Sequence, residues 1–158
     1  MLKYEQQKLE ACYETYADML YRIALSYLRN ADDAEDAVHD TFVKYVHHLL
    51  RFRDEGHERA WLIRVTVNRC KDLIKRQVHR PLEEAMEIAA PEAESSVLSL
   101  LNALDENYRM AITLHHLEGF SVEETADILQ ISVSAVKMRL LRGRQMLKTM
   151  IEKENSDV

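Results

Sequence analysis

Apolar residues recur at intervals of three and four along most of the chain, which is the spacing of one face of an α-helix. In the first half, this pattern predicts three helices over about residues 9–28, 32–50 and 58–78, with a polar break at residues 53–56. Asn30 precedes the second helix and is followed by acidic residues, as is typical of a helix N-terminus. The third helix is expected to be apolar on one side and basic on the other.

The second half of the chain carries shorter apolar stripes. They predict helices over about residues 97–104 and 105–118, with Asp105 capping the second of them and Gly119 ending it. Two further helices are expected after Gly119, a short one and then the longest one of this half. The pattern predicts helices throughout and no strands.

The composition changes between the two halves. Residues 81–93 are acidic, contain two prolines and have few large apolar side chains, which is typical of an interdomain linker. We therefore expect an all-α protein of two small helical domains, residues 1–80 and 94–158, joined by a flexible linker over residues 81–93. The chain has only three glycines and two prolines, and a sheet with tight turns would need more of both.

Charge is distributed unevenly along the chain. The formal net charge is −6, which by itself argues against a nucleic-acid partner. Two segments are nevertheless basic: residues 59–80 hold seven Lys and Arg against one acid, and residues 131–151 hold five and no acid. This distribution favours a protein that contacts DNA in two places. The alternative is two solvated helix faces.

The sequence argues against several other classes of protein. No phosphate-binding loop or nucleophile motif occurs, so we expect neither an enzyme nor a small-molecule substrate or cofactor. The paired histidines are adjacent in sequence and point to different faces of a helix, so no metal site is expected. The two cysteines form no C-x-x-C pair, and no segment has the apolar length of a signal peptide or a membrane span. We expect a cytoplasmic protein with reduced cysteines that is not a membrane protein.

Residues 121–140 have the anatomy of a helix-turn-helix. Ser121 and Glu124 form a capping box for the first helix, and Ser132 caps the second. A small residue, Ala126, stands where the helices must approach closely. Gln130 occupies a turn position that commonly holds glycine, at a cost of about 1 kcal/mol if its φ angle is positive. The outer face of the second helix carries side chains that suit a major groove: Ser134, Lys137, Met138, Leu141, Arg142 and Arg144. The alternative is a helical hairpin that packs against protein.

Three segments together resemble the extracytoplasmic-function (ECF) group of the sigma-70 family of bacterial transcription initiation factors. Two of them are similar to the family's region 2: NADDAEDAVHDTFVKYV, like its polymerase-binding helix, and RAWLIRVTVNRCKDLIKR, like its W-L-x-x-I-A-x-N-x-x-x-D-x-x-R-R signature. The third is similar to region 4: DENYRMAITLHHLEGFSVEETADILQISVSAVKMRLLRGRQMLK. The resemblance covers about residues 10–150, with both domains in the family's order.

The resemblance implies that the first domain captures unpaired bases of the non-template strand at the −10 promoter element. A pocket would form in the loop at residues 52–58, and the following helix would carry a basic track. Asn68 matches the family's signature asparagine and is the predicted base-edge contact. Trp61 also matches, either as a core anchor between helices or as a stacking partner for a base. The predicted −10 residues are Phe52, Trp61, Arg64, Asn68, Lys71, Lys75 and Arg76.

The resemblance also implies a docking surface for the largest subunit of RNA polymerase on the second helix. The predicted contacts are Asp33, Asp36, His39, Asp40 and Phe42. His39 stands where the family usually has glutamine, and acids at a helix start are also ordinary capping residues. In the second domain, the outer residues of the helix-turn-helix would read the −35 element. His115 stands where relatives often place an arginine against phosphate.

The function implied is that of an ECF sigma factor, which binds core RNA polymerase and promoter DNA and is held inactive by an anti-sigma factor. The alternative is a sigma-like decoy that binds an anti-sigma factor without initiating transcription. A decoy would not need the asparagine and basic track of the first domain or an acid-free recognition helix, and both are present. A one-domain regulator with a sensor domain would leave the first half of the chain unexplained.

Overall fold

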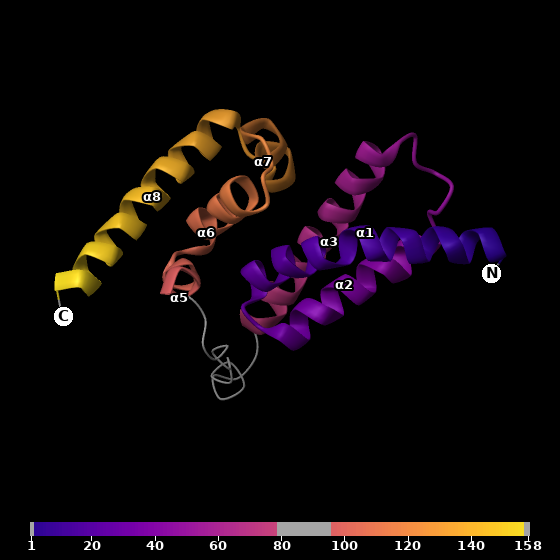
Figure 1. Ribbon diagram of the computed structural model, residues 1–158, viewed down its shortest axis with the longest axis horizontal. Coiled ribbons are helices and arrows are strands. Elements are labelled where there is room, and N and C mark those ends of the chain that lie inside the picture. The colour runs from indigo at the N-terminus through magenta and orange to yellow at the C-terminus, as the bar shows by residue number, and fades with distance from the viewer. Residues whose placement is uncertain (1, 79–95, 157–158) are drawn as a thin grey trace. The chain divides into compact units, whose positions relative to one another are not determined.

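The computed structural model describes residues 2–78 and 96–156, and all regular secondary structure in these two ranges is helical (Figure 1). The chain divides into two compact units, Met1–Ala89 and Ala90–Val158, which are described separately. The prediction of an all-α protein built from two helical domains is confirmed. The predicted linker, residues 81–93, lies outside the described residues.

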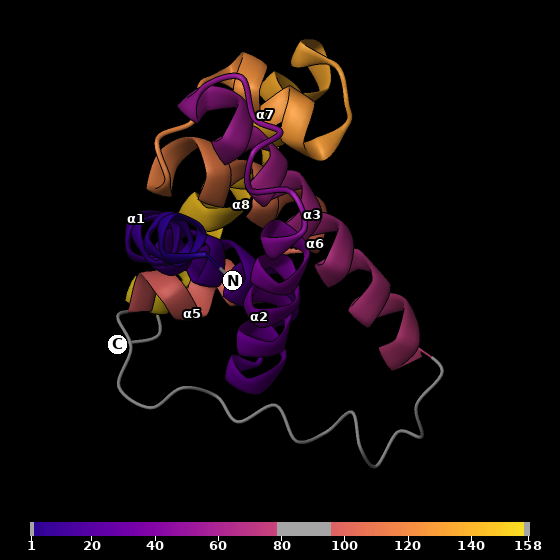
Figure 2. The same cartoon turned by 90° about the vertical axis from the view of Figure 1, so that its right-hand side faces the viewer.

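The described part of the first unit, residues 2–78, contains α1 (Lys3–Leu28), α2 (Ala31–Val46) and α3 (Glu55–Val78). Each of them packs against the other two (Figure 2). The predicted apolar stripes face inward, and removing such side chains from water is the main favourable contribution to folding. The most completely buried apolar residues of this unit are Leu20, Ile23, Ala24, Ala34, Ala37, Tyr45, Leu62, Ile63, Val67 and Cys70.

The boundaries of α2 and α3 differ from the sequence prediction at the loop between them. The Asn30 side chain caps α2 as predicted, accepting a hydrogen bond from the Asp33 N–H at 3.0 Å. However, α2 ends at Val46, and α3 begins at Glu55. The carboxylate of Asp54 accepts a hydrogen bond from the His57 N–H at 2.8 Å and so starts α3 early. The predicted pocket loop over residues 52–58 is therefore wrong in extent, because most of it is the first turn of α3.

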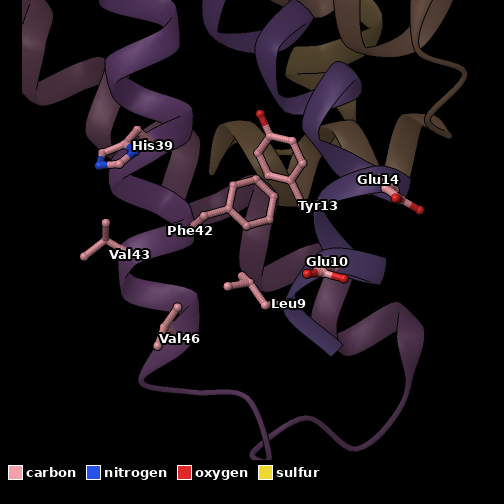
Figure 3. A pocket seen from close by; sticks show the side chains of 8 residues that line it. All are labelled: Leu9, Glu10, Tyr13, Glu14, His39, Phe42, Val43 and Val46. Atoms are coloured by element: carbon pink, nitrogen blue, oxygen red, sulfur yellow. The ribbon is translucent and has the colours of Figure 1, made fainter. Parts of the chain in front are cut away.

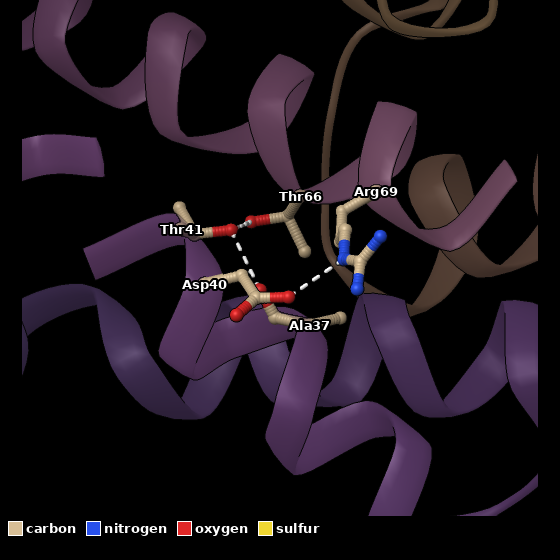
Figure 4. A network of polar contacts seen from close by, with 5 residues as sticks. All are labelled: Ala37, Asp40, Thr41, Thr66 and Arg69. Carbon is tan, nitrogen blue, oxygen red and sulfur yellow. Dashed lines mark hydrogen bonds and ion pairs between the residues drawn. The ribbon is translucent and has the colours of Figure 1, made fainter. Parts of the chain in front are cut away.

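A polar contact lies inside the interface between α2 and α3 (Figure 4). The hydroxyl oxygens of Thr41 and Thr66 are both buried and lie 2.9 Å apart, and each also lies within 3 Å of a carbonyl oxygen one turn earlier in its own helix. Next to them, the Arg69 Nε donates to Asp40 at 2.6 Å, and this ion pair is partly exposed. These two polar contacts join α2 to α3, and a slip of one helix along the other would break both of them.

The second unit contains α5 (Ser96–Ala103), α6 (Glu106–Ile112), a π-helical turn η1 (Thr113–Leu117), α7 (Val122–Leu129) and α8 (Val133–Ser156). α6 and α7 both pack against α8. Gly119 has a φ of 78°, so the residue predicted to end the helix does adopt a left-handed conformation. Asp105 is the N-cap residue of α6, as predicted, but its side chain makes no capping hydrogen bond.

A buried arginine connects α6 to the end of α5. Arg109 is 2% exposed, and its guanidinium donates a hydrogen bond to the Leu104 carbonyl at 2.8 Å. The last carbonyl groups of a helix have no partner within the helix, and a positive charge is favourable at that end. Arg109 therefore belongs to the framework of the second unit and not to its surface.

Thr125 in α7 is also fully buried, and its hydroxyl has no hydrogen-bond partner among the described residues. A buried hydroxyl without a partner costs about 1–3 kcal/mol. We expect Thr125→Val, which replaces the hydroxyl with a methyl group, to raise the free energy of unfolding of the second unit by about 1 kcal/mol. Urea unfolding followed by circular dichroism measures this. The matched control is Thr125→Ser, which keeps the hydroxyl and is expected to destabilise; a valine variant less stable than the unaltered chain would contradict the assignment.

Candidate nucleic-acid and polymerase interfaces

The helix-turn-helix is built by α7 and α8. Ser121 and Glu124 form the predicted capping box, with two reciprocal hydrogen bonds of 3.0 Å between side chains and backbone N–H groups. Ser132 caps α8 by accepting a hydrogen bond from the Ala135 N–H at 3.1 Å. Ala126 is buried where the helices meet, as predicted from its small size. These local signals fix where α8 starts and therefore which of its residues face outward.

The turn between α7 and α8 holds a residue other than glycine in a left-handed backbone conformation, which costs free energy. Gln130 has a φ of 59° and lies in the left-handed region, as considered from the sequence. Its side-chain amide donates a hydrogen bond to the Asp127 carbonyl at 2.7 Å, which offsets part of the backbone strain. The Ile131 N–H donates to the Ala126 carbonyl at 3.1 Å and closes the turn.

The outward face of α8 is exposed along the predicted DNA-binding positions. Met138 and Leu141 are 46% and 47% exposed, which is unusual for large apolar side chains and suits contact with a partner. On the opposite face, Gly143 is buried, and a Cβ atom there would lie 2.7 Å from the Ile112 Cδ1 atom. Gly143 thus lets α8 approach α6 closely. All six predicted residues of α8 are exposed: Ser134, Lys137, Met138, Leu141, Arg142 and Arg144.

His115 lies in η1 and is only partly available for a DNA contact. Its Nδ1 atom lies 2.7 Å from the Phe120 carbonyl oxygen. Because a carbonyl can only accept, Nδ1 carries the proton, and Nε2 is the nitrogen left for a partner. The half-buried ring therefore holds the turn before α7 in place and offers one nitrogen outward.

A second basic face lies on α3. Its inward side buries Ile63, Val67 and Cys70, as the apolar stripe predicted. The other side presents Asn68 to solvent, with Arg64 one turn before it and Lys71 one turn after it. The predicted track is placed on this face, where Arg64, Asn68, Lys75 and Arg76 are exposed and Lys71 is half-buried. The structure therefore brings these five residues to one accessible surface.

Phe52 and Trp61 are part of a packed aromatic cluster. The Phe52 ring stacks on Tyr45 with centroids 5.8 Å apart, and it meets the edge of Trp61 at 5.4 Å. Trp61 also contacts His48 at 5.1 Å. Both Phe52 and Trp61 are half-buried, so each ring packs against its own unit and keeps an exposed part. The two alternatives for Trp61, core anchor and stacking surface, are thus compatible.

Tyr45 is the centre of this cluster and links all three helices of the first unit. Its hydroxyl donates a hydrogen bond to the Glu58 carboxylate at 3.1 Å. It also interacts with the Cys12 thiol of α1, and burial raises the pKa of Cys12 to about 11. Burial raises the pKa of Tyr45 as well. Both cysteines are buried, as predicted from the sequence.

The predicted polymerase-binding residues of α2 are in different environments. Asp36 and His39 are exposed and Asp33 is half-buried. Asp40 is paired with Arg69 of α3, and Phe42 is only 7% exposed and contacts Tyr13 with ring centroids 5.0 Å apart. Phe42 therefore supports the helix and does not project from it. It forms the floor of a shallow apolar groove between α1 and α2, lined by Leu9, Glu10, Tyr13, Glu14, His39, Phe42, Val43 and Val46 (Figure 3).

Comparison with known proteins decides the family. Residues 12–80 match sigma-70 region 2, and residues 95–147 match sigma-70 region 4. The chain is 30% identical over 142 residues to the ECF RNA polymerase sigma-E factor of Salmonella typhimurium, covering 76% of this chain and 74% of that protein. The chain belongs to the ECF sigma factors of the sigma-70 family. Members of this family are not enzymes.

Other relatives and solved structures agree with this assignment. This sigma factor is 27% identical over 161 residues to the ECF sigma factor SigM of Bacillus subtilis, covering 94% of this chain and 98% of that one. The structure of CnrH in complex with the cytosolic domain of CnrY matches with a TM-score of 0.69 and 31% identity, over 94% of this chain and 90% of CnrH. The sigma factor RpoE of Bartonella quintana, solved with the anti-sigma factor NepR, shares the fold with a TM-score of 0.73 over 90% of this chain and 96% of that one.

Some features of these surfaces were not found from the sequence. Neither the Arg69–Asp40 ion pair nor the groove on α1 and α2 has a local signal, because both join residues far apart in the chain.

Within residues 2–78 and 96–156, no group of three or more His, Cys, Asp or Glu side chains could hold a metal ion. None of the described helices combines the length and apolar character that a membrane span requires.

Proposed function

We propose that this sigma factor binds core RNA polymerase and directs initiation at promoters with −35 and −10 elements. In this account residues 94–158 read the −35 element through α8, and residues 1–80 capture the non-template strand of the −10 element along α3. Residues 81–93 join the two and raise the effective concentration of the second contact once the first has formed. The observation that carries the proposal is the presence of two exposed basic faces on an otherwise acidic chain.

The −35 contact requires an element that fits the major groove and donors that reach base edges and phosphates. α8 presents Lys137, Arg142 and Arg144 together with exposed apolar side chains that can touch thymine methyl groups. Its N-terminal turn is capped by Ser132, so α8 is preformed and no ordering is needed on binding. Which bases of the −35 element are contacted depends on how α8 tilts in the major groove.

The −10 contact requires a stacking surface beside a cationic track for the strand backbone. The exposed parts of Phe52 and Trp61 supply the surface, at the end of α3 from which the basic face extends. Asn68 is an amide on that face and can donate to and accept from a base edge. We expect Asn68→Ala to lower transcription from a double-stranded promoter about tenfold, since one good base contact contributes about 1–3 kcal/mol.

The test of Asn68 uses a promoter in two forms, fully paired and with the −10 region already unpaired. If Asn68 acts in strand capture, the loss is larger on the paired form. The control is Gln7→Ala, which truncates an exposed amide of α1 outside the proposed set. Equal activity of Asn68→Ala and the unaltered chain on both templates would contradict the assignment of this face.

Polymerase binding is assigned to α2 and the adjoining groove. Asp36 and His39 are accessible there, and Asp33 and Phe42 lie on the same helix. Asp40 contributes by holding Arg69 and so keeping α2 in register with α3. Co-migration of the chain with core polymerase on gel filtration tests this, and weakened co-migration of Asp36→Arg is the expected result.

An anti-sigma factor is the second proposed partner. CnrH was solved with the cytosolic domain of CnrY, and RpoE of Bartonella quintana was solved with an anti-sigma factor. A similar partner would hold this chain inactive by covering the polymerase-binding and DNA-binding faces. We assign the chain to the cytoplasm, where polymerase and promoter DNA are found.

A further inference from the structure

The π-helical turn η1 holds two adjacent histidines directly after α6, the helix that packs against α8. A π turn adds a residue to the helix and shifts the direction of the side chains that follow, and such turns are frequent at functional sites. Here the His115 and His116 rings meet edge to face with centroids 4.8 Å apart. His115 is fixed by its hydrogen bond to the Phe120 carbonyl, whereas His116 is exposed.

His116 also lies close to the DNA-binding face, because Ile112, one turn before it, packs directly against Gly143, the neighbour of Arg144 in α8. The pKa of His116 is lowered by the partial burial of its ring, by His115 in the same turn and by Arg144 of α8. In the free protein, His116 therefore takes up a proton less readily than an ordinary histidine. A DNA phosphate that approaches Arg144 would reverse this balance, because a nearby negative charge favours the imidazolium form.

We propose that His116 is a phosphate-binding residue of the −35 interface that becomes protonated when DNA binds. This inference rests on the proposed function of α8. The His115 ring, held by its own hydrogen bond, contacts the His116 ring and orients it. Arg144 supplies a permanent positive charge that attracts a phosphate to the site. The imidazolium of His116 then donates a charge-assisted hydrogen bond to a phosphate oxygen. DNA binding by this sigma factor thus takes up a proton.

The sign of the pH dependence follows from this linkage. The pKa of His116 is lowered in the free protein and raised in the complex, so the complex binds more protons in the interval between the two values. Affinity for DNA therefore increases as the pH falls through that interval. One unit of difference between the two pKa values corresponds to about a tenfold change in affinity.

The test measures binding of the full chain to a duplex of about 30 base pairs of mixed sequence, at low ionic strength where phosphate contacts are strongest. Fluorescence anisotropy gives the Kd at pH about 6 and about 8 at constant salt. The unaltered chain is expected to bind about three- to tenfold more tightly at the lower pH. His116→Gln should lose that difference, and His116→Arg should bind tightly at both pH values.

Two controls separate this inference from the proposed function. His47→Gln removes an exposed histidine of the first unit and should keep the full pH dependence. The double variant Lys137→Ala, Arg142→Ala should bind weakly at both pH values. If that double variant binds as the unaltered chain does, the assignment of α8 to DNA fails. If it binds weakly but His116→Gln keeps the full pH dependence, or His116→Arg is no tighter than His116→Gln at the higher pH, the role of His116 is overturned.

Discussion

Replacing both Lys137 and Arg142 with alanine is expected to lower transcription from −35-dependent promoters about a hundred-fold, since each direct base or phosphate contact contributes about 1–3 kcal/mol. Both side chains are exposed on the outward face of α8, separated by about 1.4 helical turns. Neither packs against the rest of the second unit, because the inward face of α8 is formed by Val136, Leu140 and Gly143. The loss should therefore come from the DNA contact and not from unfolding.

A matched control is available on the same helix. Lys148 is also an exposed lysine of α8, but it lies beyond the proposed recognition residues. Lys148→Ala should keep most of the activity, and both variants should give the circular dichroism spectrum and urea midpoint of the unaltered chain. Equal losses in the two variants would show that α8 acts only as a diffuse positive charge. Full activity of the double variant would contradict −35 recognition by this face.

Replacing Tyr45 with alanine is expected to destabilise the first unit by about 3–5 kcal/mol, the range for a large buried aromatic side chain. Tyr45 is fully buried and its ring contacts Phe42, Phe52 and Trp61. The variant would leave a cavity at the point where α1, α2 and α3 meet. Urea unfolding monitored by the fluorescence of Trp61, the one tryptophan of the chain, reports directly on this region.

Tyr45→Phe separates packing from hydrogen bonding at the same site. Phenylalanine keeps the ring contacts and loses the hydrogen bond to Glu58, so we expect a loss of about 1 kcal/mol. The same comparison bears on function. Phe52 and Trp61 pack against the Tyr45 ring. Tyr45→Ala should therefore also impair promoter opening, whereas Tyr45→Phe should not. A phenylalanine variant as unstable as the alanine variant would mean that the buried polar contact outweighs the packing.

The sequence predicted those parts of the fold that depend on local signals. The Asn30 cap and the capping box of Ser121 and Glu124 each depend on residues within a few positions, and both were predicted correctly. The start of α3 was placed too late because Asp54, three residues before His57, was not recognised as its cap. Asp105 shows the converse, since a residue suited to capping makes no capping bond.

The candidate sites were predictable only in part, because their final form depends on tertiary packing. The exposed face of α8 followed from periodicity. The burial of Phe42 did not, because it depends on how Tyr13 of α1 packs over α2. Nor could the sequence show that Asp40 is held by Arg69, 29 positions away. The π turn at His115 and His116 has no sequence pattern, and only the structure shows the edge-to-face contact of these two rings.

The most direct test of the central claim is to map transcript 5′ ends made by core RNA polymerase on a fragmented genomic template, with and without this sigma factor. The account predicts new starts that share one pair of −35 and −10 sequences, and these starts should disappear with an Asn68→Ala, Arg142→Ala variant. Binding of the chain to core polymerase without any new shared start would contradict the account and favour a decoy. Failure to bind core polymerase would contradict it altogether.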